Sequence, residues 1–138
     1  MKSIIVHDTI GGTNVNVEIP SGLSIIYQDS GTGKSYMFKL LTAYFLSRSI
    51  PYLLIDSHTV GDGKIDPSTI LTMCSGKKAV LLDNANLYIT DDLLKGICDR
   101  VPYVVMSIKD STLSFRGLCP KYYCVTYTGS NLELRLMR

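Results

Sequence analysis

The chain has 138 residues, 46% of them hydrophobic, so a single domain spanning residues 1–138 can bury a core without disulfides or metals. Lysine and arginine number 14 against 12 for aspartate and glutamate, and this near balance indicates neither a nucleic-acid partner nor an anionic membrane. The four cysteines are scattered along the chain, which argues against a zinc site or a disulfide scaffold. The apolar runs are far shorter than the roughly twenty residues of a membrane span. We therefore expect a cytoplasmic protein.

Short apolar and β-branched runs predict eight strands. In chain order they are Ser3–Val6, Val15–Ile19, Leu23–Tyr27, Tyr52–Ile55, Ala79–Leu82, Tyr103–Ile108, Tyr122–Thr128 and Leu132–Leu136. Helices are predicted from Lys34 to about Ser47, over Pro67–Met73, and from a Thr90 cap to about Cys98. Glycine-containing turns make hairpins of the first two and the last two strands. This order predicts an α/β fold, with a mostly parallel central sheet, helices on both faces and antiparallel hairpins at the N- and C-termini.

The segment between the third strand and the first helix has the composition of a phosphate-binding loop. Glycines allow main-chain N–H groups to converge on a phosphate chain at a helix N-terminus, where the helix dipole favours negative charge. Lys34 would reach the β- and γ-phosphates, and Ser35 would place its hydroxyl on Mg²⁺. The predicted nucleotide-binding residues are Asp29, Ser30, Gly31, Thr32, Gly33, Lys34, Ser35 and Tyr36.

Two aspartates are candidates for the acid that holds the metal ion, because each follows an apolar strand whose carboxyl end should lie near the loop. We favour Asp83, which follows the second strand after the loop, as the metal acid together with Ser35. Asp56 follows the first such strand. It either contributes to the site or caps the turn after its strand.

The segment Gln28–Ser35, together with Val80–Asp83, resembles the P-loop NTPase superfamily. The narrower resemblance is to the group with an additional strand between the phosphate-loop strand and the Walker B strand, to which ABC-type and AAA-type ATPases belong. It covers Leu23 to about Ile108. It implies an ATP-binding P-loop fold in which Lys34 and Ser35 are the Walker A pair and Asp83 is the Walker B acid. Ser107, at the end of the next strand, matches the position of the polar residue that senses the γ-phosphate.

The chain departs from this pattern at several positions. Gln28 replaces the first glycine of the loop motif, and Asn84 stands where hydrolytic members carry a glutamate. Neither an ABC signature sequence nor the length of an AAA lid is present. Asn84 can orient a water molecule without deprotonating it, which predicts slow hydrolysis. Arg116 is a candidate arginine finger for a neighbouring subunit, although a solvated loop arginine is the simpler interpretation.

The leading hypothesis is a small Mg²⁺-dependent ATPase, with Lys34, Asp83 and Asn84 as its catalytic residues. It would act as a switch or accessory factor whose nucleotide state is read by a protein partner or by further copies of the chain. One alternative is a small-molecule kinase in which Asp56 or His58 holds the acceptor. The other is a non-catalytic nucleotide-binding module, which Asn84 favours.

Overall fold

The computed structural model describes residues 3–27, 34–56, 66–109 and 113–137. The strands are β1 (Ser3–Ile10), β2 (Thr13–Pro20), β3 (Gly22–Tyr27), β4 (Tyr52–Ile55), β5 (Ala79–Leu82), β6 (Tyr103–Ile108), β7 (Lys121–Thr128) and β8 (Asn131–Leu136). The helices in this part of the chain are α1 (Lys34–Ser47), α2 (Pro67–Met73) and α3 (Asp91–Arg100), with a 3₁₀ turn, η1, at Ala85–Leu87. The predicted strands and helices are therefore confirmed as local elements.

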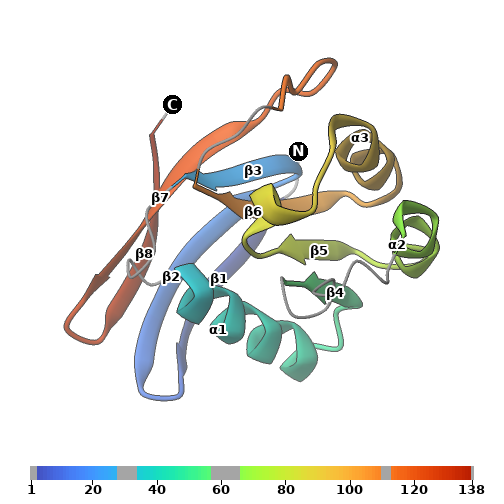
Figure 1. The fold of residues 1–138 in the computed structure, drawn as a ribbon. Coiled ribbons are helices and arrows are strands. Elements are labelled where there is room, and N and C mark those ends of the chain that lie inside the picture. The colour runs from blue at the N-terminus through green and yellow to red at the C-terminus, as the bar shows by residue number, and fades with distance from the viewer. Residues whose placement is uncertain (1–2, 28–33, 57–65, 110–112, 138) are drawn as a thin grey trace.

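All eight strands belong to one sheet, in the order β1-β2-β8-β7-β3-β6-β5-β4 (Figure 1). Neighbouring strands from β7 through β3, β6 and β5 to β4 run parallel. The pairs β1–β2 and β7–β8 are antiparallel hairpins, as predicted. The two hairpins also join each other, because β2 pairs in parallel with β8 at Val15 and Leu132. Hairpin strands therefore make up half of the sheet.

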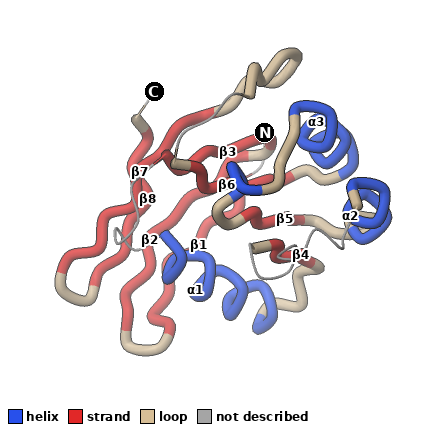
Figure 2. Tube along the Cα trace, viewed as in Figure 1, coloured by secondary structure: helices blue, strands red, loops and turns tan. Residues whose placement is uncertain are grey.

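The predicted fold class is wrong. We expected an α/β P-loop fold with a mostly parallel sheet and helices on both faces, whereas the sheet is mixed and curls into a half-barrel (Figure 1). Strands make up 43% and helices 27% of the described residues, so the three short helices cover only part of the sheet (Figure 2). The reason is that the two hairpins, joined to each other through β2 and β8, form half of the same sheet. In β2 the buried residues Val15, Val17 and Ile19 alternate with exposed ones, which suits a sheet with one face in water.

Helix α1 packs on the face around which the sheet curls, and it contacts both edge strands, β1 and β4. Its Met37, Phe38 and Phe45 side chains are buried in one cluster with residues of both hairpins, among them Val6 and Val125. Burying such side chains stabilises the fold by about 1.5–3 kcal/mol each. Because the same cluster includes hairpin and parallel strands, α1 holds the two halves of the sheet together.

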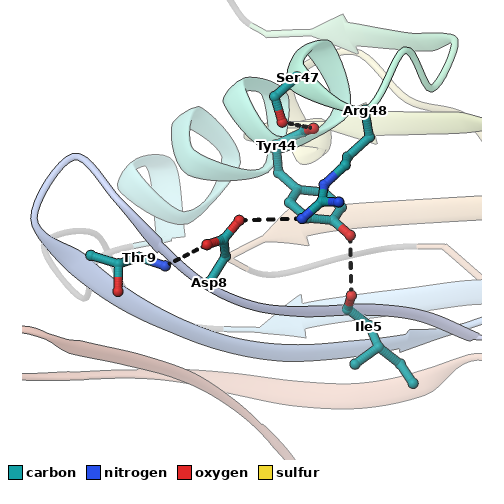
Figure 3. Close-up of polar contacts among 6 residues, drawn as sticks. All are labelled: Ile5, Asp8, Thr9, Tyr44, Ser47 and Arg48. Carbon is teal, nitrogen blue, oxygen red and sulfur yellow. Dashed lines mark hydrogen bonds and ion pairs between the residues drawn. The ribbon is translucent and has the colours of Figure 1, made fainter.

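Polar contacts also join Tyr44 of α1, and Arg48 directly after the helix, to the edge strand β1 (Figure 3). The Tyr44 hydroxyl donates to the Ile5 carbonyl oxygen at 3.3 Å, and the Arg48 guanidinium lies 3.5 Å from the Asp8 carboxylate. The same guanidinium lies over the Tyr44 ring, 5.2 Å from its centroid. A side chain that occupies a carbonyl of an edge strand removes one group that would otherwise pair with another chain.

Helices α2 and α3 pack against a second cluster, formed by the alternate residues of β3 to β6. On β5, for example, Val80 and Leu82 belong to this second cluster and Leu81 to the first. Gly96 of α3 brings the two helices close, because a Cβ there would lie 2.9 Å from the Leu71 side chain of α2. The central parallel strands β5 and β6 are thus buried on both faces, which holds their carboxyl ends in fixed relative positions.

Candidate functional site

The carboxyl ends of β3, β6 and β5 lie side by side at one edge of the sheet. In the strand register Ile26 of β3 is opposite Ser107 of β6, and Met106 of β6 is opposite Leu82 of β5. Asp83 therefore follows β5 at the level of Ser107. β3 ends at this edge with Tyr27, the residue before the Gln28–Ser35 segment. The strand ends that carry Asp83 and Ser107 thus lie side by side, as expected, with the end of β3 next to them.

Ser107 links the two residues that follow β5. Its hydroxyl donates to Oδ1 of Asp83 at 2.9 Å and accepts the backbone N–H of Asn84 at 2.9 Å. The Ser107 side chain is fully buried. Hydrogen bonds to charged groups are stronger than neutral ones, so the hydroxyl fixes the orientation of the Asp83 carboxylate.

Asn84 adopts a left-handed backbone conformation, with φ 51° and ψ 47°. Asparagine tolerates this region better than most residues other than glycine. The conformation turns the chain sharply out of β5 and into the 3₁₀ turn η1, and the Asn84 N–H meets Ser107 at this turn. The left-handed conformation and this hydrogen bond together fix the position of the Asn84 backbone next to Asp83.

Tyr88, which follows η1, lies between the ends of β4 and β5. Its hydroxyl is 2.8 Å from the Asp83 carbonyl oxygen and 3.0 Å from the Ile55 carbonyl oxygen. Burial raises the pKa of Tyr88, and the nearby charges of Asp83 and Asp56 raise this pKa further. The two candidate metal acids therefore both lie within electrostatic reach of one hydroxyl. Tyr88 was not among the predicted site residues. The only feature of the sequence that points to it is its place five residues after Asp83.

Most of the predicted phosphate-binding loop lies outside the described residues. This holds for Asp29, Ser30, Gly31, Thr32 and Gly33, and also for His58, the alternative acceptor-holding residue. Lys34 and Ser35 are the first two residues of α1, as predicted, but their side chains are outside the described part as well. Their predicted contacts with phosphate and Mg²⁺ stay predictions.

Tyr36, in the first turn of α1, contacts both hairpins. Its hydroxyl lies 2.7 Å from the Thr13 hydroxyl at the start of β2, and its ring centroid lies 5.3 Å from that of Tyr127 in β7. The hairpins also contact each other directly here, since the Asn14 N–H donates to the Ser130 carbonyl oxygen at 2.6 Å. Tyr36 thus fixes the start of α1 to the hairpin half of the sheet.

The loop that carries Arg116 is attached to the start of α3. The Asp91 carboxylate accepts the backbone N–H groups of Ser114 and Phe115, at 2.9 and 3.2 Å. Asp91 thus has a structural role at the helix N-terminus. The Arg116 side chain is exposed.

No three histidine, cysteine, aspartate or glutamate side chains gather as a metal site within the described ranges. Magnesium is commonly held by one or two carboxylates, with phosphate oxygens and waters completing its shell. Asp83, with Asp56 at the same edge, offers donors of this type. All four cysteines are free.

None of the helices in the described part of the chain is both long and apolar enough to cross a membrane. Comparison of the chain with models of protein families and with curated protein sequences gives no match.

Proposed function

We propose that the chain binds ATP with Mg²⁺ and hydrolyses it slowly. The observation that supports this most is the hydrogen-bonded pair of Asp83 and Ser107, at the sheet edge where β3 ends and the Gln28–Ser35 segment begins. A carboxylate held at the edge where β3 ends, with a glycine-rich segment and a helix following β3 in the chain, suits a metal-bound phosphate chain.

Each residue has a distinct role in this proposal. The segment Asp29–Gly33 and Lys34 bind the phosphates, and Ser35 and Asp83 hold the metal ion. Bound Mg²⁺ would neutralise charge on the β- and γ-phosphate oxygens. Ser107 keeps the Asp83 carboxylate in one orientation, which removes part of the entropic cost of binding the ion.

The hydrolytic step is attack of a water oxygen on the γ-phosphorus, with cleavage of the bond to the bridging oxygen. The products are ADP and inorganic phosphate, and the proton of the water passes to a phosphate oxygen or to solvent. The Asn84 amide can hold the water by hydrogen bonds but accepts no proton at neutral pH. Slow turnover follows, and with it a long-lived ATP-bound state that suits a switch.

A non-catalytic nucleotide-binding module is the second candidate, and Asn84 is the observation that favours it. A small-molecule kinase is the other alternative, with Asp56 or His58 holding the acceptor. We further propose that the protein acts in the cytoplasm, where free cysteines are the rule, and that a protein partner or further copies of the chain read its nucleotide state.

Thermal unfolding with and without ATP and Mg²⁺ tests binding. At one hundred times the dissociation constant, the ligand adds about 2.7 kcal/mol to the free energy of unfolding. Lys34→Ala should abolish this stabilisation. Lys39→Ala, on an exposed position of the same helix, should preserve it. Equal affinity of the parent and the Lys34→Ala protein for ATP would overturn the proposal.

Phosphate release separates the three activities. An ATPase yields free phosphate without any acceptor, a kinase transfers the phosphoryl group to an acceptor, and a binding module does neither. Loss of phosphate release in Asp83→Asn, with the parental rate in Lys39→Ala, would assign the activity to this site.

A further inference from the structure

The Tyr88 hydroxyl joins the main chain of two strands at the point where their pairing ends. The β4–β5 register ends at Ile55 and Leu82, and the Asp83 N–H still donates to the Ile55 carbonyl oxygen at 2.8 Å. Tyr88 contacts that same carbonyl oxygen and the carbonyl oxygen of Asp83. The hydroxyl therefore holds the backbone of Asp83 and that of Ile55, the residue before Asp56.

A sharp turn and side-chain packing fix the position of Tyr88. The left-handed Asn84 and the turn at buried Ala85 reverse the chain, and the Tyr88 N–H donates to the Ala85 carbonyl oxygen at 3.0 Å. The ring packs against the cluster that includes α2 and α3. Because the ring is anchored in this way, the hydroxyl can determine where the strand ends lie.

We infer that Tyr88 is a positioning residue, whose hydroxyl sets the place of the Asp83 carboxylate, and its spacing from Asp56, for Mg²⁺ bound with a nucleoside triphosphate. This inference rests on the proposed function. Ligands of a metal ion must be held to within about 0.5 Å, and residues that orient them from behind affect metal affinity strongly. Without the hydroxyl, the Asp83 carbonyl oxygen loses a partner, and the chain between β5 and η1 can shift.

The test compares the magnesium dependence of ATP binding in the parent and in Tyr88→Phe, with a fluorescent ATP analogue as the probe. Tyr88→Phe should raise the Mg²⁺ concentration for half-maximal binding by about tenfold or more. Binding of the analogue in EDTA should not change, because the phosphate-binding loop is untouched. Tyr52→Phe, at the other end of β4, is the matched control and should behave as the parent in both conditions.

Two further variants separate positioning from a general structural role. Asp83→Asn combined with Tyr88→Phe should show the same magnesium dependence as Asp83→Asn alone, because Tyr88 acts through Asp83. Replacement of Tyr88 by 4-aminophenylalanine, which donates from the same ring position, should restore the parental magnesium dependence.

The failures of the two proposals are distinguishable. If the parent shows no magnesium-dependent ATP binding, the proposed function fails and this inference fails with it. If the parent binds but Tyr88→Phe has an unchanged magnesium dependence, only the role of Tyr88 is overturned. An equal loss of binding with and without magnesium, or loss of cooperative unfolding in Tyr88→Phe, would also overturn it, since the hydroxyl would then hold the fold rather than the site.

Discussion

Two buried serines on adjacent strands allow a direct test of the hydrogen bonds at the candidate site. Ser107 on β6 bonds with both Asp83 and Asn84, whereas the Ser24 hydroxyl on β3 is buried and has no hydrogen-bond partner among the described residues. The side chains are 0% and 1% exposed, so Ser107→Ala and Ser24→Ala remove the same group from equally buried positions.

The two substitutions should have different effects on the free energy of unfolding. Ser107→Ala removes a hydrogen bond to a carboxylate, worth about 1.5–3 kcal/mol, and leaves the Asn84 N–H without its partner. We expect a loss of about 2–4 kcal/mol, which lowers the midpoint of thermal unfolding by about 6–12 °C for a chain of this size. Ser24→Ala removes a desolvated hydroxyl, so stability should be unchanged or rise by about 1 kcal/mol.

Urea unfolding followed by circular dichroism measures both effects, and equal denaturant slopes would confirm that the unfolded states are comparable. If the free energies of unfolding of the two variants differ by less than about 0.5 kcal/mol, the Ser107 hydroxyl does not hold Asp83 as described, and the reasoning is refuted.

Other parts of the fold give further predictions. Thr90→Ala removes the N-terminal cap of α3 and should cost about 1 kcal/mol in urea unfolding, whereas Thr90→Ser should cost little. Tyr36→Phe and Thr13→Val should each cost about 1 kcal/mol, and together no more than either alone, because they break one hydrogen bond. Burial raises the pKa of Cys98 to about 11, whereas Cys119 is exposed, so mass spectrometry should find iodoacetamide on Cys119 first at pH 8. The stability linked to the Cys98 thiol is present below pH 9 and is lost as pH rises through 11.

The local elements could be predicted from the sequence because their signals are local. The β-branched runs, the turns at Gly11 and Gly129 and the alternation in β2 gave the strands and both hairpins. The pairing of β2 with β8 could not be predicted, since these strands are separated by more than one hundred residues. The periodicity of a strand does not specify which other strand pairs with its free edge. The curl of the sheet depends on that pairing, and the fold class was wrong for this reason.

The candidate site was partly predictable. Asp83 and Ser107 were expected at strand ends, but their contact requires β5 and β6 to be neighbours. Tyr88 was missed because its position depends on a left-handed residue, Asn84, whose conformation a pattern of hydrophobicity does not encode. The phosphate-binding loop was predicted from its glycine, lysine and serine pattern between a strand and a helix, and it stays a prediction, as Gln28–Gly33 lies outside the described residues.

The conformation of Asn84 bears on whether the chain hydrolyses ATP. A residue other than glycine or asparagine at φ 51° and ψ 47° costs roughly 1 kcal/mol, so the backbone by itself disfavours glutamate here. Asn84→Glu should therefore lower the free energy of unfolding by about 1 kcal/mol, and Asn84→Gly should leave it nearly unchanged. If the amide orients the attacking water, Asn84→Gly should also reduce phosphate release while ATP affinity is retained. Equal release by the parent and Asn84→Gly would mean that asparagine is present for its backbone alone.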